Sequence, residues 1–134
     1  STDSQQNHTL NMLKPKVLPE ILSQCNSDGI RTTILFNLDG SLLATVGEDS
    51  TAEKNTAASV SAIMANIWGS FQKGGETNVV LMDCENGRVG VTKVANKLLL
   101  CLYGDKTTHF GALKLKAEVL AKYLEEPLGK ILST

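Results

Sequence analysis

The sequence has no excess of charge of either sign. Its 13 lysines and arginines stand against 14 aspartates and glutamates, and the basic residues are scattered along the chain rather than clustered. Nucleic acids and anionic membrane surfaces are bound by clustered basic side chains. The charge pattern therefore favours protein partners, or none, and argues against nucleic acid.

Cysteines and long apolar runs are also scarce. Cys25, Cys84 and Cys101 are odd in number, have no C-x-x-C spacing and stand in apolar surroundings. This setting is typical of small buried side chains in a reducing compartment. No apolar run approaches the length of a membrane-spanning helix, and no charged-then-apolar leader opens the sequence. We expect no direct membrane insertion, so a membrane location would depend on partners.

Residues that often carry catalysis occur outside recognisable motifs. His8 and His109 have no cysteine or carboxylate neighbours at metal-ligand spacing. Gly74-Gly75 lacks the Lys-Ser/Thr of a phosphate-binding loop, and no serine lies in a G-x-S-x-G elbow. Asp83 and Glu85 flank a turn, where solvated carboxylates are common. We expect no catalytic residue, no metal and no cofactor, and an enzyme is the least favoured interpretation.

The hydrophobic pattern predicts one domain with the element order α-β-β-α-β-β-β-α. Helices are expected from residue 15 to Asp28-Gly29, over 52–72 and over 108–126, where Pro127 would end the last one. Strands are expected over 30–37, 41–46, 77–83, 88–94 and 98–103. Several strands are apolar on both faces and need cover on both. The prediction is an α/β sandwich with a five-stranded, mainly antiparallel sheet between helices.

The two ends of the chain differ from this pattern. Residues 1–11 are polar and aperiodic, and they precede a methionine at position 12 that resembles a natural start. We interpret residues 1–11 as a flexible extension or a remnant of cloning. The folded domain is expected over residues 12–128, followed by a C-terminal tail over 129–134.

The long central helix carries two apolar stripes. Helical spacing of three and four groups the large side chains into one stripe and the small ones into another. The large stripe comprises Val60, Ile63, Met64, Ile67, Trp68 and Phe71, and the small stripe comprises Ala58, Ala62, Ala65 and Gly69. We expect the large stripe to face the chain's own sheet and the small stripe to admit a partner helix at close range.

The strand after this helix would offer its free edge to the same partner. Edge-to-edge pairing of that strand with an equivalent strand would extend the sheet across two subunits. The predicted partner interface comprises Ala58, Ala62, Ala65, Asn66, Gly69, Asn78, Val80 and Met82.

Seven segments, in order along the chain, resemble a known family. They are MLKPK at 12–16, NLDGSLLA at 37–44, ANIW at 65–68, LMDCENGRV at 81–89, VAN at 94–96, LLCLY at 99–103 and YLEEPL at 123–128. Together they resemble the roadblock-domain adaptors of the late endosomal/lysosomal adaptor, MAPK and MTOR activator family, which are subunits of the Ragulator complex. The resemblance covers about residues 12–128.

The resemblance implies a roadblock/profilin-like fold and a non-enzymatic scaffold. Such an adaptor forms a heterodimer with a second roadblock-type adaptor, the MEK-partner scaffold subunit. A lipidated membrane-anchoring Ragulator subunit would hold the pair on the cytoplasmic face of late endosomes and lysosomes. Through the complex, the chain would reach Rag-type GTPases and support TOR complex activation and MAP-kinase signalling.

Two other interpretations stay open. A self-pairing roadblock protein, of the dynein light-chain type or a small-GTPase regulator, would share the fold and interface but serve other partners. A small-ligand sensor could use a helix-covered sheet of this size, although one tryptophan and few candidate buried polar residues offer little to a ligand. Mass in solution, with and without a second adaptor, distinguishes the heterodimer from the homodimer.

Overall fold

The computed structural model describes residues 22–23, 29–47, 53–75, 78–85 and 87–133. Its elements are, in chain order, β1 (Ile30–Asn37), β2 (Leu42–Gly47), α3 (Glu53–Gln72), β3 (Val79–Asp83), β4 (Arg88–Val94), β5 (Leu98–Gly104) and α4 (Phe110–Ser133). All seven elements lie within two residues of their predicted starts. Among the strands, the predicted ranges of β1 and β4 match at both ends.

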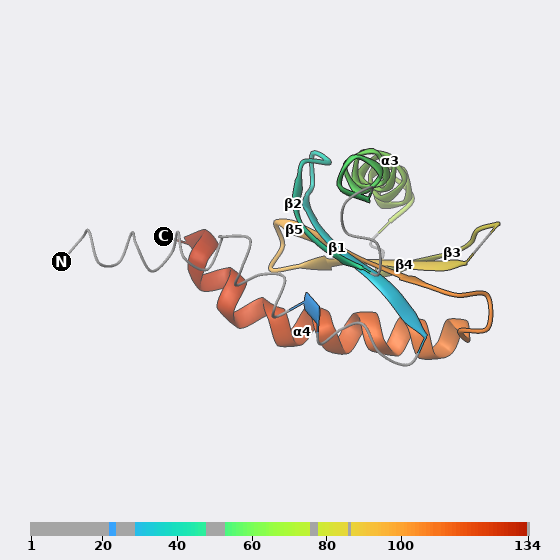
Figure 1. Cartoon of the computed structure of the whole chain (residues 1–134). Helices are drawn as coiled ribbons and strands as arrows, with labels where there is room; N and C mark the ends of the chain where they lie inside the picture. Colours follow the sequence, from blue (N-terminus) through green and yellow to red (C-terminus); the bar gives the residue numbers. More distant parts are fainter. Residues whose placement is uncertain (1–21, 24–28, 48–52, 76–77, 86, 134) are drawn as a thin grey trace.

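The five strands form one sheet in the order β2-β1-β5-β4-β3. Each neighbouring pair is antiparallel. Helix α3 lies over one face and α4 over the other (Figure 1). The predicted α/β sandwich is confirmed.

Strand β5 explains how the two faces acquire separate cores. Successive side chains of a strand point to opposite faces, so Leu100 and Leu102 join the cluster beneath α4. Leu99 and Cys101 join the cluster beneath α3. The unbroken apolar run of this strand therefore reflects cover on both faces.

Two tight turns fix the hairpins. In the β1–β2 turn, Gly40 has φ +95°, which glycine adopts without steric cost. Its backbone N–H donates to the Asn37 carbonyl at 2.9 Å. The β4–β5 turn uses Ala95 (φ +54°) and Asn96 (φ +60°), two left-handed residues in succession. Since alanine is not a usual turn signal, the sequence does not predict this second turn.

The predicted end of the last helix is wrong. Helix α4 does not stop before Pro127 but continues to Ser133. Leu128 is buried in the α4-side cluster, one turn beyond Leu124 in the same cluster. Burial of Leu128 accounts for a helix that continues past a proline, despite the lost hydrogen-bond donor. Residues 129–133, expected as a tail, belong to this helix.

The N-terminal predictions fall mainly outside the described residues. Of the predicted first helix, only Leu22 and Ser23 are described, and both are helical. Leu22 is fully buried in the α4-side cluster. The extension expected over residues 1–11, and Cys25, lie outside the described residues.

Candidate functional site

Helix α3 meets the sheet through a stripe that includes small residues. Ala57, Ser61 and Trp68 are buried, at intervals of four and seven residues. The Ser61 hydroxyl donates to the Ala58 carbonyl at 3.0 Å, so burial leaves it satisfied. Among the described side chains of α3, Trp68 is the one large side chain that is buried in this contact, and its predicted inward orientation is confirmed.

The assignment of the large stripe to the sheet is wrong in part. Ile63 and Phe71 are 55% and 51% exposed. Both are on the stripe predicted to be internal. Val60, Met64 and Ile67 lie between these extremes and are partly buried. Helix α3 is therefore rotated relative to the prediction, and large apolar side chains reach its outer surface.

The small stripe is used partly by the chain itself. Ala65 packs against the core cluster beneath α3. Ala62 lies against the β1–β2 turn, where a Cβ added at Gly40 would stand 3.0 Å from the Ala62 Cα. Ala58, Asn66 and Gly69 are exposed, as a partner surface requires. Ala62 is itself exposed, so the hairpin covers only one side of it and the partner contact predicted there stays a prediction.

Strand β3 is an edge strand, since only β4 pairs with it. Residues Val79 to Met82 carry no charge and no proline, the usual protections of an exposed edge. Val80 is buried and Met82 is partly buried on the α3 side of the sheet. Asn78 is exposed just before the strand. The edge is suited to main-chain pairing with another strand.

The outer side of α3 and the free edge of β3 lie on the same face of the molecule. Met64 and Ile67 of α3 belong to the same apolar cluster as Val80 and Met82 of β3. The opposite flank of α3, at Ala62, faces the β1–β2 turn. Exposed Ile63 therefore lies on the flank of α3 turned away from that hairpin, and a partner there can contact both α3 and the β3 edge.

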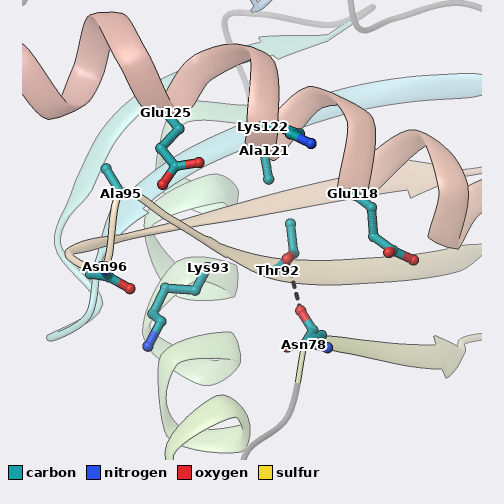
Figure 2. A pocket seen from close by; sticks show the side chains of 9 residues that line it. All are labelled: Asn78, Thr92, Lys93, Ala95, Asn96, Glu118, Ala121, Lys122 and Glu125. Atoms are coloured by element: carbon teal, nitrogen blue, oxygen red, sulfur yellow. Dashed lines mark hydrogen bonds between the residues drawn. The ribbon is translucent and has the colours of Figure 1, made fainter.

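A cavity of about 370 Å³ opens on the other face, between α4 and the start of β3 (Figure 2). Its rim carries two lysines and two glutamates, namely Lys93, Lys122, Glu118 and Glu125. The Thr92 hydroxyl donates to the Asn78 carbonyl at 2.8 Å. The lining has no cysteine, histidine or nucleophile–base pair, and its balanced charge selects no ionic ligand.

The carboxylates considered at the β3–β4 hairpin have a structural setting. Lys106 donates a hydrogen bond to Asp83 at 3.0 Å, and this bond lowers the pKa of the Asp83 carboxyl below its usual value. Glu85 is exposed in the turn. His109 is exposed just before α4, and its carbonyl accepts from the Leu113 N–H at 3.0 Å. Within the described ranges, no three His, Cys, Asp or Glu side chains are grouped to hold a metal.

Cys101 is fully inside the sheet, and burial raises the pKa of its thiol to about 12, with a smaller contribution from the nearby Cys84. A thiol with such a pKa stays protonated and is a poor nucleophile. Cys84 is half-buried, and both cysteines are free.

No helix in the part of the chain that the structure describes is long and apolar enough to span a membrane.

Three comparisons place this fold among known proteins. Residues 21–104 match the Roadblock/LC7 domain family. The chain is 37% identical over 122 residues to the Caenorhabditis elegans protein named Ragulator complex protein LAMTOR2 homolog, covering 90% of this chain and 96% of that relative. The resemblance noted in the sequence is thereby confirmed.

Solved structures agree at the level of fold. A Roadblock/LC7 domain from Streptomyces avermitilis has a TM-score of 0.69 at 15% identity, covering 82% of this chain and 96% of that one. MglB from Myxococcus xanthus has a TM-score of 0.68 at 14% identity, covering 87% and 88%. With a family match over most of the chain and a relative spanning nearly its full length, the chain belongs to the Roadblock/LC7 domain family.

Proposed function

We propose that the chain is a non-enzymatic adaptor subunit that pairs with a second roadblock protein in a Ragulator-like complex. The observation that carries this proposal is the 37% identity to the nematode LAMTOR2 homolog, which extends over 96% of that relative. A match of that extent includes the helices and strands that would meet a partner, as well as the core.

The partner would bind the outer side of α3 together with the edge of β3. Ile63 and Phe71 would bury apolar surface that is now more than half exposed. The free edge at Val80 and Met82 would pair with the partner's corresponding strand and continue the sheet. Ala58, Ala62, Ala65, Asn66, Gly69 and Asn78 would surround this contact as predicted from the sequence, with Ala62 and Ala65 acting partly through the chain's own packing.

Within the larger assembly, we assign this chain a supporting role. A lipidated subunit would hold the heterodimer on the cytoplasmic face of late endosomes and lysosomes. Rag-type GTPases would be reached through the complex, for TOR complex activation and MAP-kinase signalling. These assignments rest on the similarity to a Ragulator protein.

The test is the mass of the chain alone and after mixing with a second roadblock adaptor. Light scattering after gel filtration should give one 14.4 kDa subunit alone and a one-to-one pair with the adaptor. A stable homodimer that does not exchange with the adaptor would instead support the self-pairing roadblock alternative.

A matched pair of variants locates the interface. Ile63→Arg should leave the melting temperature unchanged, because the side chain is exposed, but weaken adaptor binding at least tenfold by placing an unpaired charge in the contact. Leu115→Arg, on the exposed side of α4, is the control and should bind normally. Equal affinities for both variants would refute an interface at α3.

A further inference from the structure

Successive residues of β3 direct their main-chain groups alternately toward β4 and away from it. In an antiparallel ladder, opposed residues alternate between pairs that exchange two hydrogen bonds and pairs that exchange none. The Cys84 N–H donates to the Gly87 carbonyl at 2.8 Å, which makes these two residues a bonded pair at the hairpin. The register of β3 on β4 runs without a shift from the hairpin back to Val79. The alternation therefore continues along the whole strand.

This alternation assigns the main-chain groups of β3 to one side or the other. Val80 and Met82 lie an even number of residues before the hairpin pair, so they form the next bonded pairs with β4. The N–H and C=O groups of Val79, Leu81 and Asp83 then point to the free edge, where no described strand meets them. Leu81 is the middle residue of these three.

The α4-side core holds Leu81 in place. Its side chain packs against that cluster. On the facing strand, a Cβ added at Gly90 would stand 3.4 Å from Cδ2 of Leu81 and 3.2 Å from Cγ of Leu113. Because this packing fixes the residue, its outward N–H and C=O have a defined direction before a partner arrives, which reduces the entropy lost on binding.

The one charged side chain of β3 does not protect the free edge. Charged side chains on edge strands normally discourage pairing with another chain. Here the Asp83 carboxylate accepts a hydrogen bond from Lys106 Nζ at 3.0 Å and lies 3.6 Å from Arg88 Nε. Both cations belong to the same subunit, so the carboxylate needs no cation from a partner. An uncharged partner strand therefore suits this edge.

We propose that Leu81 is the central pairing residue of the adaptor interface, with its N–H and C=O bonded to the corresponding residue of an antiparallel adaptor strand. This inference rests on the proposed adaptor function and identifies the main-chain contacts of that interface. With Leu81 at the centre, Val79 and Asp83 are also paired, each opposite the adaptor residue that corresponds to the other. A register displaced by two residues would carry one of them past the end of an adaptor strand of equal length.

The register also determines what the adaptor must present. The axis that relates two antiparallel strands at Leu81 is perpendicular to the sheet, so the adaptor's equivalent of α3 lies on the same face as α3. Val80 and Met82 belong to the cluster on that face, and each would lie opposite an adaptor side chain at close range. A displacement of one residue would turn the adaptor's side chains to the other face. The fitting partner is a strand with apolar side chains on both sides of its own central residue.

Amide hydrogen exchange, resolved by residue with NMR, tests the assignment in the unmodified chain. It is measured at a concentration where light scattering gives the mass of one subunit. The Leu81 N–H should exchange faster than those of Val80 and Met82, which are bonded to β4. One equivalent of the adaptor should slow exchange at Leu81 roughly tenfold or more. Equal protection of the three amides in the isolated chain, or no slowing at Leu81 in the formed pair, would overturn the proposal.

Proline substitution tests the same group by removing it. Leu81→Pro deletes an N–H that faces the free edge, a position where edge strands tolerate proline. Leu81→Ala is the matched control, because it loses the leucine side chain but keeps the N–H. The two variants should have similar melting temperatures, whereas Leu81→Pro should bind the adaptor roughly tenfold or more weakly than Leu81→Ala. Met82→Pro deletes an N–H bonded to β4 and should have a much lower melting temperature.

The outcomes separate this inference from the adaptor function. If the unmodified chain forms the one-to-one pair and Leu81→Pro binds as tightly as Leu81→Ala, the adaptor function stands and the central role of Leu81 is wrong. If Leu81→Pro unfolds while Leu81→Ala stays folded, the Leu81 N–H is used within the chain, and its assignment to the free edge is wrong. If the unmodified chain forms no pair with an adaptor, the proposed function itself is wrong.

Discussion

Arg88 joins three parts of the structure through one side chain. Its Nη1 donates to the Thr108 carbonyl at 2.8 Å, and its guanidinium lies 4.4 Å from the centre of the Phe110 ring. Its Nε lies 3.6 Å from the Asp83 carboxylate. The residue thereby ties the β3–β4 hairpin and the start of α4 to the sheet.

Truncating this side chain should destabilise the fold. Arg88→Ala should lower the free energy of unfolding by about 1–3 kcal/mol, because it removes a hydrogen bond from a charged donor and a cation–π contact. Arg88→Lys should recover only part of the loss, since an ammonium group lacks the planar fork. Urea denaturation measures both values, and a fully stable Arg88→Ala would show that these contacts contribute nothing net.

Cys101 should make stability fall at high pH. Its pKa is about 12 when folded and 9.0 in the reference state. Folding thus favours the protonated thiol, so this contribution is complete below pH 9 and is lost as the pH rises from 9 toward 12. The slope of the unfolding free energy against pH over that range should be smaller in Cys101→Ala.

At pH 8, alkylation should modify Cys101 only after urea is added.

At the scale of elements, α3 offers a direct comparison of two aromatic side chains on one predicted stripe. Trp68 is 4% exposed and Phe71 is 51% exposed. Trp68→Ala should cost about 3–5 kcal/mol of stability, whereas Phe71→Ala should cost less than about 1 kcal/mol. Chemical denaturation of the two variants measures the difference. Similar losses would mean that both side chains face the core, as the sequence pattern suggested.

Gly69 tests how closely a partner helix approaches α3. It lies in the helix interior, and a Cβ added there would meet nothing within 4 Å. Gly69→Ala should therefore raise the free energy of unfolding by about 0.5–1 kcal/mol. If a partner helix packs tightly at this position, the same variant should weaken adaptor binding. Unchanged affinity would exclude a close approach at Gly69.

The position of α3 in the sequence could be predicted, but its rotation could not. Apolar residues occur on both sides of the helix, so periodicity alone does not show which side meets the sheet. In the structure Ala62 lies against Gly40, a contact made by tertiary packing that the periodicity does not show. The end of α4 was missed for a similar reason, because burial of Leu128 outweighs the local signal of Pro127.

At the scale of the whole molecule, local signals identified strands but not all of their neighbours. In the sequence, the dipeptides Asp39-Gly40 and Asn86-Gly87 are typical of hairpin turns, and they predict that β1 pairs with β2 and β3 with β4. No comparable signal predicts that β5 lies between β1 and β4. The free edge at β3, and hence half of the candidate interface, follows from that strand order. The elements of the proposed interface could be named from the sequence, whereas the exposure of Ile63 and Phe71 required the packed structure.

The central place of β5 also has a consequence for synthesis and folding. Ile30 of β1 pairs with Gly104, near the end of the strand portion of the chain. While a ribosome is still making β3 and β4, β1 has already emerged. The edge of β1 that will pair with β5 is then unpaired, and Ile34 and Phe36 lack this neighbouring strand. Closure of the sheet must wait for a contact that is distant in sequence. A nascent or truncated chain that stops before residue 98 would thus be prone to aggregation and would depend on chaperones.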